Sequence, residues 1–513
     1  MAFWWVELLW QAIVNISNDK KKVVKINSFL PEEMLKMIFS FLPPKDLKSA
    51  VLVCKLWSRV GQAPGLWSWV TFYAQNNEAM VEQMRLPRLQ NVSLLKITAP
   101  HVSEELMEEV AKHPGLKKVE TEASGTNLSL VRPELVARAL SKMEDLNLWG
   151  TRLTVDQLNC LFANLASGKN STPKGKLDLL ENDLYADGID HLLLAAAITR
   201  FKIIGLDFVT QTVSQSTCNS DSVLIAIFDA LGSSFSCVQH LELYSVNLSP
   251  VDAKVLAKAV SKMNRLHLRR CSITPHQATE LFIAIGEDES KLTMLDLNSV
   301  DLSAADVEVL AREVPKIRWV LLQSCSLTAR QATALFTSIG EDECKLRVLD
   351  LSANDLSSVQ PSFFIRPLKF LKGLYLNGTN LTTNQVETIL DGLENASNII
   401  THLRLDDIDV SQVDSTKLVK VNHLRVVTLW QTQISEQQII DILEASLTAT
   451  KLDKIRWGHY DDGGMRCFAT AGTFEEWEKL QELLSIFKSR QNEEFYRAKF
   501  FREIPYHPCT CFE

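Results

Sequence analysis

Side chains able to carry chemistry are present in this sequence, but they do not form a catalytic pattern. The ten cysteines include no Cys-x-x-Cys pair, and the histidines stand singly, without the partners that a metal centre or general base needs. No His-Glu-x-x-His, Gly-x-Ser-x-Gly or Gly-x-Gly-x-x-Gly motif occurs, and Gly168-Lys169-Asn170 lacks the upstream glycine of a phosphate-binding loop. We therefore expect no catalytic residues, no cofactor and no metal.

One acidic motif, Gly-Glu-Asp-Glu, occurs twice, at 286–289 and 340–343. Grouped carboxylates can bind a cation. Recurrence at the same place in a duplicated segment favours a solvated turn at the end of a helix instead.

Composition excludes several classes of protein. Of 513 residues 73 are leucine, and the formal net charge of −8 argues against a strongly basic nucleic-acid-binding protein. No apolar run reaches the ~20 residues that cross a bilayer.

The dispersed cysteines indicate reduced thiols and a cytoplasmic or nuclear location. The apolar segment from Met1 to Ile16 contains Glu7, and the lysines of this region follow it, whereas a secretory signal has its basic residues first. This order favours an N-terminal extension over a secretory signal or membrane anchor.

The leucines follow a repeat. The pattern Leu-x-Leu-x-x-x-x-Leu recurs at Leu241, Leu266, Leu295, Val320, Leu349, Leu374, Leu403 and Val427, with separations of 25, 29, 25, 29, 25, 29 and 24 residues. Segments 271–303 and 325–357, 54 residues apart, are identical at 21 of 33 positions. Two repeat types therefore alternate.

Each repeat predicts a strand followed by a helix. Leu-x-Leu has the period of a strand with one buried face, and Ala278, Leu281, Phe282 and Ile285 have helical spacing. Such units share a core only when stacked, which predicts an α/β solenoid with parallel strands on the concave side and helices on the convex side. These residues resemble leucine-rich repeats of the ribonuclease-inhibitor subtype, which places Cys or Asn after the strand. Cys271, Cys325 and Asn380 are assigned to that position, where a structural role is expected.

Residues 29–70 form a different module. Pro31 and the two glutamates after it suit the start of a helix, Pro43-Pro44 ends it, and a second helix is expected from Asp46 to about Val60. Seven of the nine residues from Met34 to Leu42 are apolar, more than a module of this size buries alone. The surplus predicts packing on the repeats or a partner.

This module resembles an F-box, a three-helix domain that binds a small adaptor protein (the S-phase-kinase-associated adaptor) and, through it, a cullin scaffold and a RING subunit. The resemblance covers nearly the whole module and departs at Gly61-Gln62-Ala63. It implies adaptor contacts for Leu30, Pro31, Leu35, Ile38, Leu42, Leu47, Val53 and Trp57. With the repeats, it implies a substrate receptor of a cullin-RING ubiquitin ligase of the SCF type.

Strand alternation also predicts the target-binding face. If the Leu-x-Leu leucines point inward, the residues around them face the concave side. The candidates are Trp149, Tyr244, His267, Arg269, Trp319, Gln323, Tyr375, Asn377, Arg404, Asp406, Trp430 and Arg456. Trp, Tyr and Arg are enriched at interface hot spots, although Trp319 and Trp430 could equally pack on neighbouring repeats.

The predicted domains are an N-terminal extension (1–26), the F-box (27–74), a linker helix (75–90), the repeat array (91–458) and a helical cap and tail (459–513), in which Thr473 to Glu476 form a capping-box pattern. The expected partners are the adaptor, a cullin and an unidentified target protein, with neither nucleic acid nor membrane. A ligase-independent inhibitor or scaffold is the alternative, and a secreted or membrane receptor a third.

Overall fold

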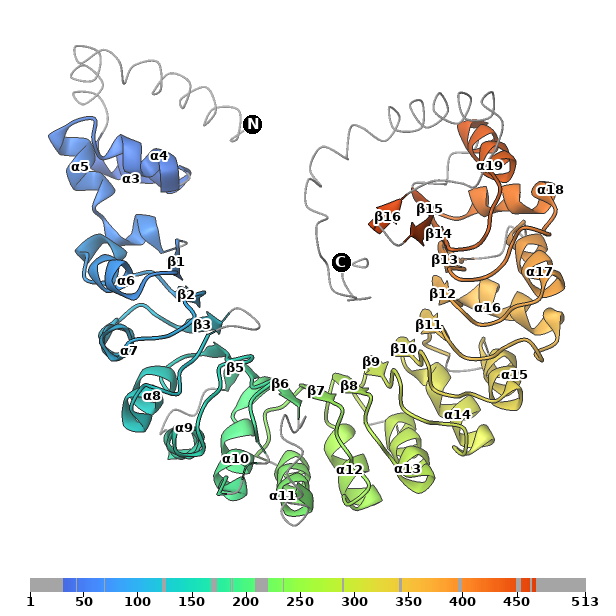
Figure 1. The fold of residues 1–513 in the computed structure, drawn as a ribbon, viewed down its shortest axis with the longest axis horizontal. Coiled ribbons are helices and arrows are strands. Elements are labelled where there is room, and N and C mark those ends of the chain that lie inside the picture. Colours follow the sequence, from blue (N-terminus) through green and yellow to red (C-terminus); the bar gives the residue numbers. More distant parts are fainter. Residues whose placement is uncertain are drawn as a thin grey trace. The chain divides into compact units, whose positions relative to one another are not determined.

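The structure of the chain is a computed structural model with side chains. It describes residues 31–466 except 43, 69, 122–125, 168–172, 185, 187, 208–219, 234, 288–289, 341–343, 395–398, 449–453 and 462–463. The chain divides into two compact units, Met1–Val246 (unit 1) and Asn247–Glu513 (unit 2), and each is described by itself (Figure 1).

Unit 1 begins with a small helical module. Its elements are α3 (Glu32–Ser40), α4 (Pro44–Ala50), α5 (Lys55–Gly61) and the 3-10 helix η1 (Pro64–Trp67). The single helix expected from Asp46 to about Val60 is wrong, because a turn over residues 51–53 separates α4 from α5. The break lets α5 pack against α3, with Trp57 edge-on against Phe39 at 5.3 Å between ring centroids.

Unit 1 continues as strands and helices in alternation. The strands are β1 (Thr71–Ala74), β2 (Leu94–Ile97), β3 (Lys118–Thr121), β4 (Asp145–Asn147), β5 (Lys174–Asp178), β6 (Phe201–Asp207) and β7 (His240–Tyr244). The helices are α6 (Asn77–Met84), η2 (Pro87–Leu89), α7 (Glu104–Lys112), α8 (Pro133–Leu140), α9 (Val155–Ser167), α10 (His191–Ile198) and α11 (Ser220–Leu231). Each strand pairs in parallel with the next, so the strands form one layer and the helices the other (Figure 1).

Unit 2 repeats this plan. Its helices are α12 (Ala253–Val260), α13 (Pro275–Gly286), α14 (Val307–Glu313), η3 (Val314–Lys316), α15 (Ala329–Ser338), η4 (Pro361–Phe364), α16 (Ile365–Phe370), α17 (Thr383–Leu393), α18 (Ser415–Leu418), η5 (Val419–His423) and α19 (Glu436–Thr448). Its strands are β8 (Arg265–Arg269), β9 (Met294–Asp296), β10 (Trp319–Leu321), β11 (Val348–Asp350), β12 (Gly373–Tyr375), β13 (His402–Arg404), β14 (Val426–Trp430), β15 (Lys454–Asp461) and β16 (Gly464–Arg466). Strands β8 to β15 pair in parallel in sequence order, and β16 pairs antiparallel with β15. The predicted α/β leucine-rich-repeat fold is confirmed.

Two predicted boundaries change. Because β1 pairs in parallel with β2, the repeat array begins at Thr71, and residues 75–90 are part of its first repeat rather than a linker. At the other end the strand layer extends past residue 458 through β15 and β16. The N-terminal extension and the capping-box pattern at Thr473 to Glu476 lie outside the described residues. Among the described helices, none is long and apolar enough to span a membrane.

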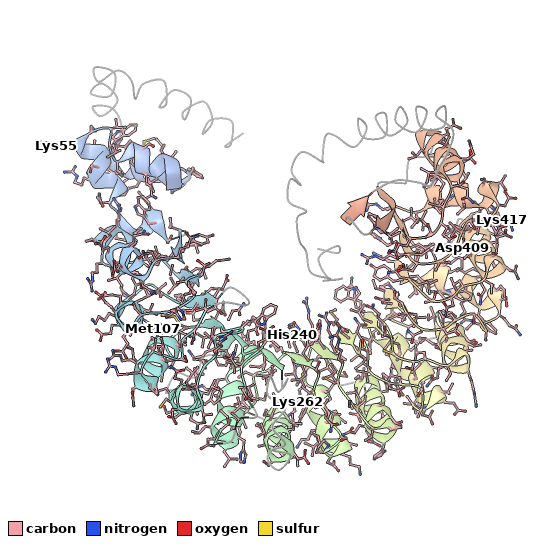
Figure 2. All side chains as sticks on the ribbon, in the orientation of Figure 1. Lys55, Met107, His240, Lys262, Asp409 and Lys417 are labelled. Carbon is pink, nitrogen blue, oxygen red and sulfur yellow. The ribbon has the colours of Figure 1, made fainter. Side chains whose placement is uncertain are left out.

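The core lies between the two layers, as strand alternation predicts. Leu295, Leu297 and Leu302 are fully buried, and Met107 of α7, labelled in Figure 2, is buried in the same way in unit 1. Burying such side chains contributes about 2 kcal/mol each.

Three residues after the second strand leucine, a buried small side chain closes the turn. Cys271 and Cys325 occupy this position, and the Cys325 thiol donates to the carbonyl of Leu297 at 3.1 Å. Burial raises the pKa of Cys325, which fits the predicted structural role. The assignment of Asn380 is wrong by one residue: Thr379 is buried and its hydroxyl donates to the carbonyl of Leu376 at 2.6 Å, whereas Asn380 is exposed.

Buried glutamines join five of the described repeats to the repeat before them. In unit 2 the amide nitrogen of Gln331 donates to the carbonyls of Leu302 and Ala305 at 2.8 and 3.0 Å. Its amide oxygen accepts from the backbone N–H of Thr328, which completes the capping box of α15. Gln157, Gln277, Gln385 and Gln438 make the same pair of contacts. We call these residues the glutamine clamps.

Candidate protein-interaction surfaces

One side of α3 exposes large apolar side chains. Met34, Met37 and Phe41 are 48%, 63% and 61% exposed. Their spacing of three and four residues places them on one side of the helix, while Leu35 and Phe39 face the interior. We call Met34, Met37 and Phe41 the α3 apolar face. A helix normally buries its apolar stripe, so a face of this kind indicates a binding surface.

The residues predicted to contact an adaptor divide into two groups. Leu35, Leu42, Leu47 and Trp57 are at most 3% exposed, so the assignment of these four to a contact surface is corrected: they form the core of the module. Pro31 is exposed, Ile38 and Val53 are half-buried, and Leu30 lies outside the described residues. Counting apolar residues predicted a surplus correctly, but only the helical spacing of 34, 37 and 41 could have identified which side chains face outward.

Trp67 connects the helical module to the first repeat. Its indole nitrogen donates to the carbonyl of Gly61 at 2.7 Å, and the ring is 1% exposed. The guanidinium of Arg88, which lies in η2 of the first repeat, stands 5.3 Å from the ring centroid. The indole therefore contacts both the helical module and the repeat array.

The strand face of unit 1 carries charges in pairs. Lys96 of β2 contacts Glu120 of β3 at 2.9 Å, Lys118 pairs with Asp145 of β4, and Lys176 contacts Asp178 at 2.9 Å. Of the residues predicted there, Trp149 is half-buried and Tyr244 is 36% exposed. This face therefore combines paired charges with two accessible aromatic residues.

The strand face of unit 2 contains the remaining predicted residues, and their accessibility differs. Contrary to the exposure that was expected, His267 and Tyr375 are 5% and 2% exposed, and the Arg404 guanidinium lies 4.6 Å from the Tyr375 ring centroid. The remaining described candidates, Arg269, Trp319, Gln323, Asn377, Arg404, Asp406 and Trp430, are half-buried, and the side chain of Arg456 lies outside the description.

Asp296 is buried beneath two side chains of β8. Its carboxylate lies 2.6 Å from the Nε of Arg269 and 3.3 Å from the Nδ1 of His267. Burial opposes ionisation, but the hydrogen bond from His267 and the charge of Arg269 outweigh it and hold the pKa of Asp296 below its ordinary value.

Two other aspartates on the strand face of unit 2 have a raised rather than a lowered pKa. Burial raises the pKa of Asp350, whose carboxylate accepts from the backbone N–H of Ser352 at 2.9 Å. Burial also raises the pKa of Asp406, although it accepts from the Trp430 N–H at 2.8 Å and the Thr428 hydroxyl at 3.1 Å. Hydrogen bonds from backbone N–H groups and a hydroxyl therefore hold both carboxylates in place where β11 and β13 end.

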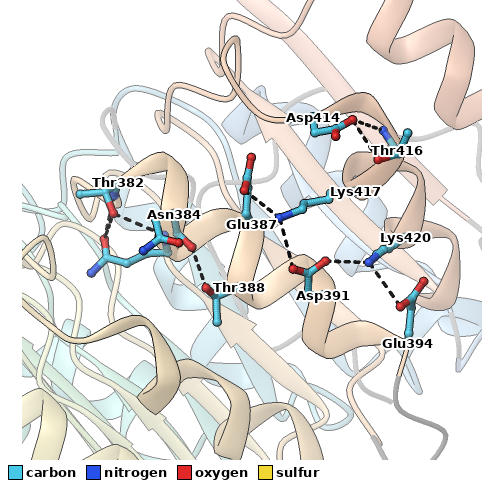
Figure 3. A network of polar contacts seen from close by, with 11 residues as sticks. Thr382, Asn384, Glu387, Thr388, Asp391, Glu394, Asp414, Thr416, Lys417 and Lys420 are labelled. Carbon is cyan, nitrogen blue, oxygen red and sulfur yellow. Dashed lines mark hydrogen bonds and ion pairs between the residues drawn. The ribbon is translucent and has the colours of Figure 1, made fainter.

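Two lysines on the helical side of unit 2 have acidic partners. Lys417 of α18 contacts Glu387 and Asp391 of α17 at 2.8 and 3.3 Å, and Lys420 of η5 contacts Asp391 and Glu394 at 2.6 and 3.3 Å (Figure 3). Each lysine thus has two carboxylates within reach, so both positive charges are compensated.

Comparison with known proteins identifies the helical module. The F-box-like family model matches residues 28–73. No curated protein sequence matches the chain. The matched module and the repeat array together define the class: the chain joins an F-box-like domain to leucine-rich repeats.

Several solved structures are similar to the chain. The Rad7 and Elc1 complex in yeast matches at 14% identity over 82% of this chain and 93% of that chain, with a TM-score of 0.41. The leucine-rich repeat-containing protein LegL7 from Legionella pneumophila matches at 16% identity over 60% and 97%, with a TM-score of 0.39. The TLR13–ssRNA13 complex matches at 13% identity over 76% and 60%, with a TM-score of 0.43.

Proposed function

We propose that this chain is the substrate-recognition subunit of an SCF-type cullin-RING ubiquitin ligase. The observation that carries the proposal is the α3 apolar face, which lies inside the segment matched by the F-box-like family. The module buries its own core, so these exposed side chains are left for a partner. The F-box resemblance supports the small adaptor protein as that partner, and we propose that a cullin binds through it.

The repeat array would hold the target protein. Its strand layers offer half-buried Trp and Arg side chains and the exposed Tyr244, the residue types enriched at interface hot spots. The chain would contribute proximity between target and ubiquitin-carrying enzyme rather than a catalytic group of its own. We place this activity in the cytoplasm or nucleus, in keeping with the cysteine pattern.

Replacing the α3 apolar face tests adaptor binding. Met37→Glu/Phe41→Glu should weaken binding of the full chain to the purified adaptor more than about 30-fold, because two exposed apolar anchors are lost while the core is untouched. Isothermal titration calorimetry measures the affinity, and circular dichroism checks the fold.

The matched control is Leu130→Glu/Leu192→Glu, which changes two leucines that are 73% and 67% exposed elsewhere in unit 1. This variant should bind like wild type. A folded wild-type chain that fails to bind the adaptor would overturn the proposal. A chain that binds a target whose ubiquitination does not change on depletion of this protein would favour the ligase-independent scaffold instead.

A further inference from the structure

Three cations stand side by side where three strands of unit 2 begin. Arg318, Arg347 and Lys372 immediately precede β10, β11 and β12. The backbone N–H of Arg347 donates to the carbonyl of Arg318 at 2.9 Å, and that of Lys372 donates to the carbonyl of Arg347 at 2.7 Å. Arg318 and Lys372 are exposed and Arg347 is half-buried. We call these three residues the basic strand edge.

No described acidic side chain forms an ion pair with any of the three. The Arg318 guanidinium lies 5.0 Å from the Trp319 ring centroid, and Arg347 donates to the carbonyl of Leu346 at 2.8 Å, contacts that leave both positive charges uncompensated. Like charges at opposed positions on neighbouring strands destabilise a sheet. On the helical side of the same unit, Lys417 and Lys420 each have two acidic partners. Folding alone therefore does not account for the basic strand edge.

Positive charge continues from this edge into a cavity. Lys345, two residues before Arg347, lines a cavity of about 850 Å³ together with Arg265 and Lys291. Lys316 also lines the cavity, but its ammonium group contacts Glu313 at 2.9 Å. The cavity walls include one described acid, Glu287. The cavity therefore extends the cationic surface and offers room for side chains of a bound segment.

We propose that the basic strand edge and the adjoining cavity bind an acidic, extended peptide segment of a partner protein. Neighbouring strands lie about 4.8 Å apart, so the three cations span about 10 Å, the length of roughly three extended residues. A surface this small, on a chain of net charge −8, suits a short run of Asp and Glu better than a nucleic acid, whose binding needs many phosphate contacts. As a statement about the ligase target, the inference rests on the proposed function; the binding itself does not.

Fluorescence anisotropy with the full-length chain tests the proposal. The probe is a labelled peptide containing the run Glu-Asp-Glu-Asp-Glu, and its partner replaces each acid by the corresponding amide. The acidic peptide should bind and the amide peptide should not. Raising NaCl from about 50 mM to about 300 mM should weaken binding about tenfold, because the surface is solvated.

Charge reversal identifies the surface. Arg318→Glu/Lys372→Glu should weaken peptide binding at least about tenfold. The matched control, Lys254→Glu/Lys258→Glu, makes the same change in net charge on exposed residues of α12 and should bind like wild type.

Failure of wild type to bind the acidic peptide, equal losses in both charge-reversal variants, or tighter binding of a single-stranded oligonucleotide of equal charge would each overturn the inference. Adaptor affinity is measured on the same preparations. Loss of adaptor binding with peptide binding intact overturns the proposed function alone, and the reverse result overturns this inference alone.

Discussion

At the scale of single residues, Asp296 and Asp350 occupy equivalent positions in the duplicated segments but have opposite electrostatic roles. Asp296 has Arg269 and His267 beside it, and its pKa is lowered. Asp350 accepts from the Ser352 backbone, and burial raises its pKa. A lowered folded-state pKa means that the ionised carboxylate stabilises the fold, and a raised one means that ionisation costs stability.

Asparagine substitutions at the two positions should therefore differ in sign. At pH 7, Asp296→Asn should lower the free energy of unfolding by about 3 kcal/mol, because the half-buried guanidinium of Arg269 loses the carboxylate it is paired with. Asp350→Asn should leave stability unchanged or raise it, because the amide oxygen can still accept from Ser352. Both differences should shrink as the pH falls below about 4, where the unfolded carboxyls become protonated. Urea denaturation of each variant between acidic and neutral pH measures this, and losses of equal size at pH 7 would contradict it.

At this scale, the sequence predicted which side chains lie on the strand face, but it did not predict how exposed each of them is. Strand alternation placed Trp319, Arg404 and Trp430 on the strand face, where they are half-buried. It could not predict that Tyr375 is covered, because the covering side chain, Arg404, comes from the next strand, 29 residues later. The burial of Tyr375 depends on the length and rotamer of a side chain in the neighbouring repeat. Neither property can be read from the spacing of the leucines.

At the scale of elements, each glutamine clamp fixes the helix in which it lies to the repeat before it. Gln331 satisfies two buried carbonyls and the first backbone N–H of its own capping box. Unsatisfied buried polar groups cost about 1–3 kcal/mol each.

Gln331→Ala should therefore lower the free energy of unfolding by about 3 kcal/mol. Gln360→Ala, at an exposed glutamine that forms no side-chain cap, is the matched control and should change it by less than about 0.5 kcal/mol. Chemical denaturation followed by circular dichroism compares the two. Similar effects in both variants would show that the clamp contributes nothing specific.

The elements themselves were largely predictable, because the leucine pattern repeats and each strand is followed by a helix. The start of the array was missed because β1 reads Thr-Phe-Tyr-Ala and lacks the Leu-x-Leu signature. The single helix from Asp46 was wrong because α4 and α5 are only seven residues long each, too short for apolar periodicity to reveal the turn between them.

At the scale of the molecule, Trp67 holds the F-box-like domain against the first repeat. Trp67→Ala should accelerate tryptic cleavage between Arg59 and Arg88 by about tenfold or more, because the indole fills the contact between η1 and η2. Adaptor affinity should remain within about twofold, since the α3 apolar face is distant in sequence and unchanged. Unaltered cleavage kinetics would mean that other contacts hold the junction.

The glutamine clamps also restrict how such a chain can change length during evolution. Gln277, Gln331 and Gln385 recur every 54 residues, and each donates to carbonyls of a repeat that has no clamp of its own. Excision of 54 residues would rejoin a donor repeat to an equivalent acceptor repeat. Excision of a single repeat would place two repeats with a clamp, or two repeats without one, next to each other. Buried polar groups would then lose their hydrogen-bond partners. Gain and loss of repeats should therefore proceed in pairs, so that homologous arrays differ by even numbers of repeats.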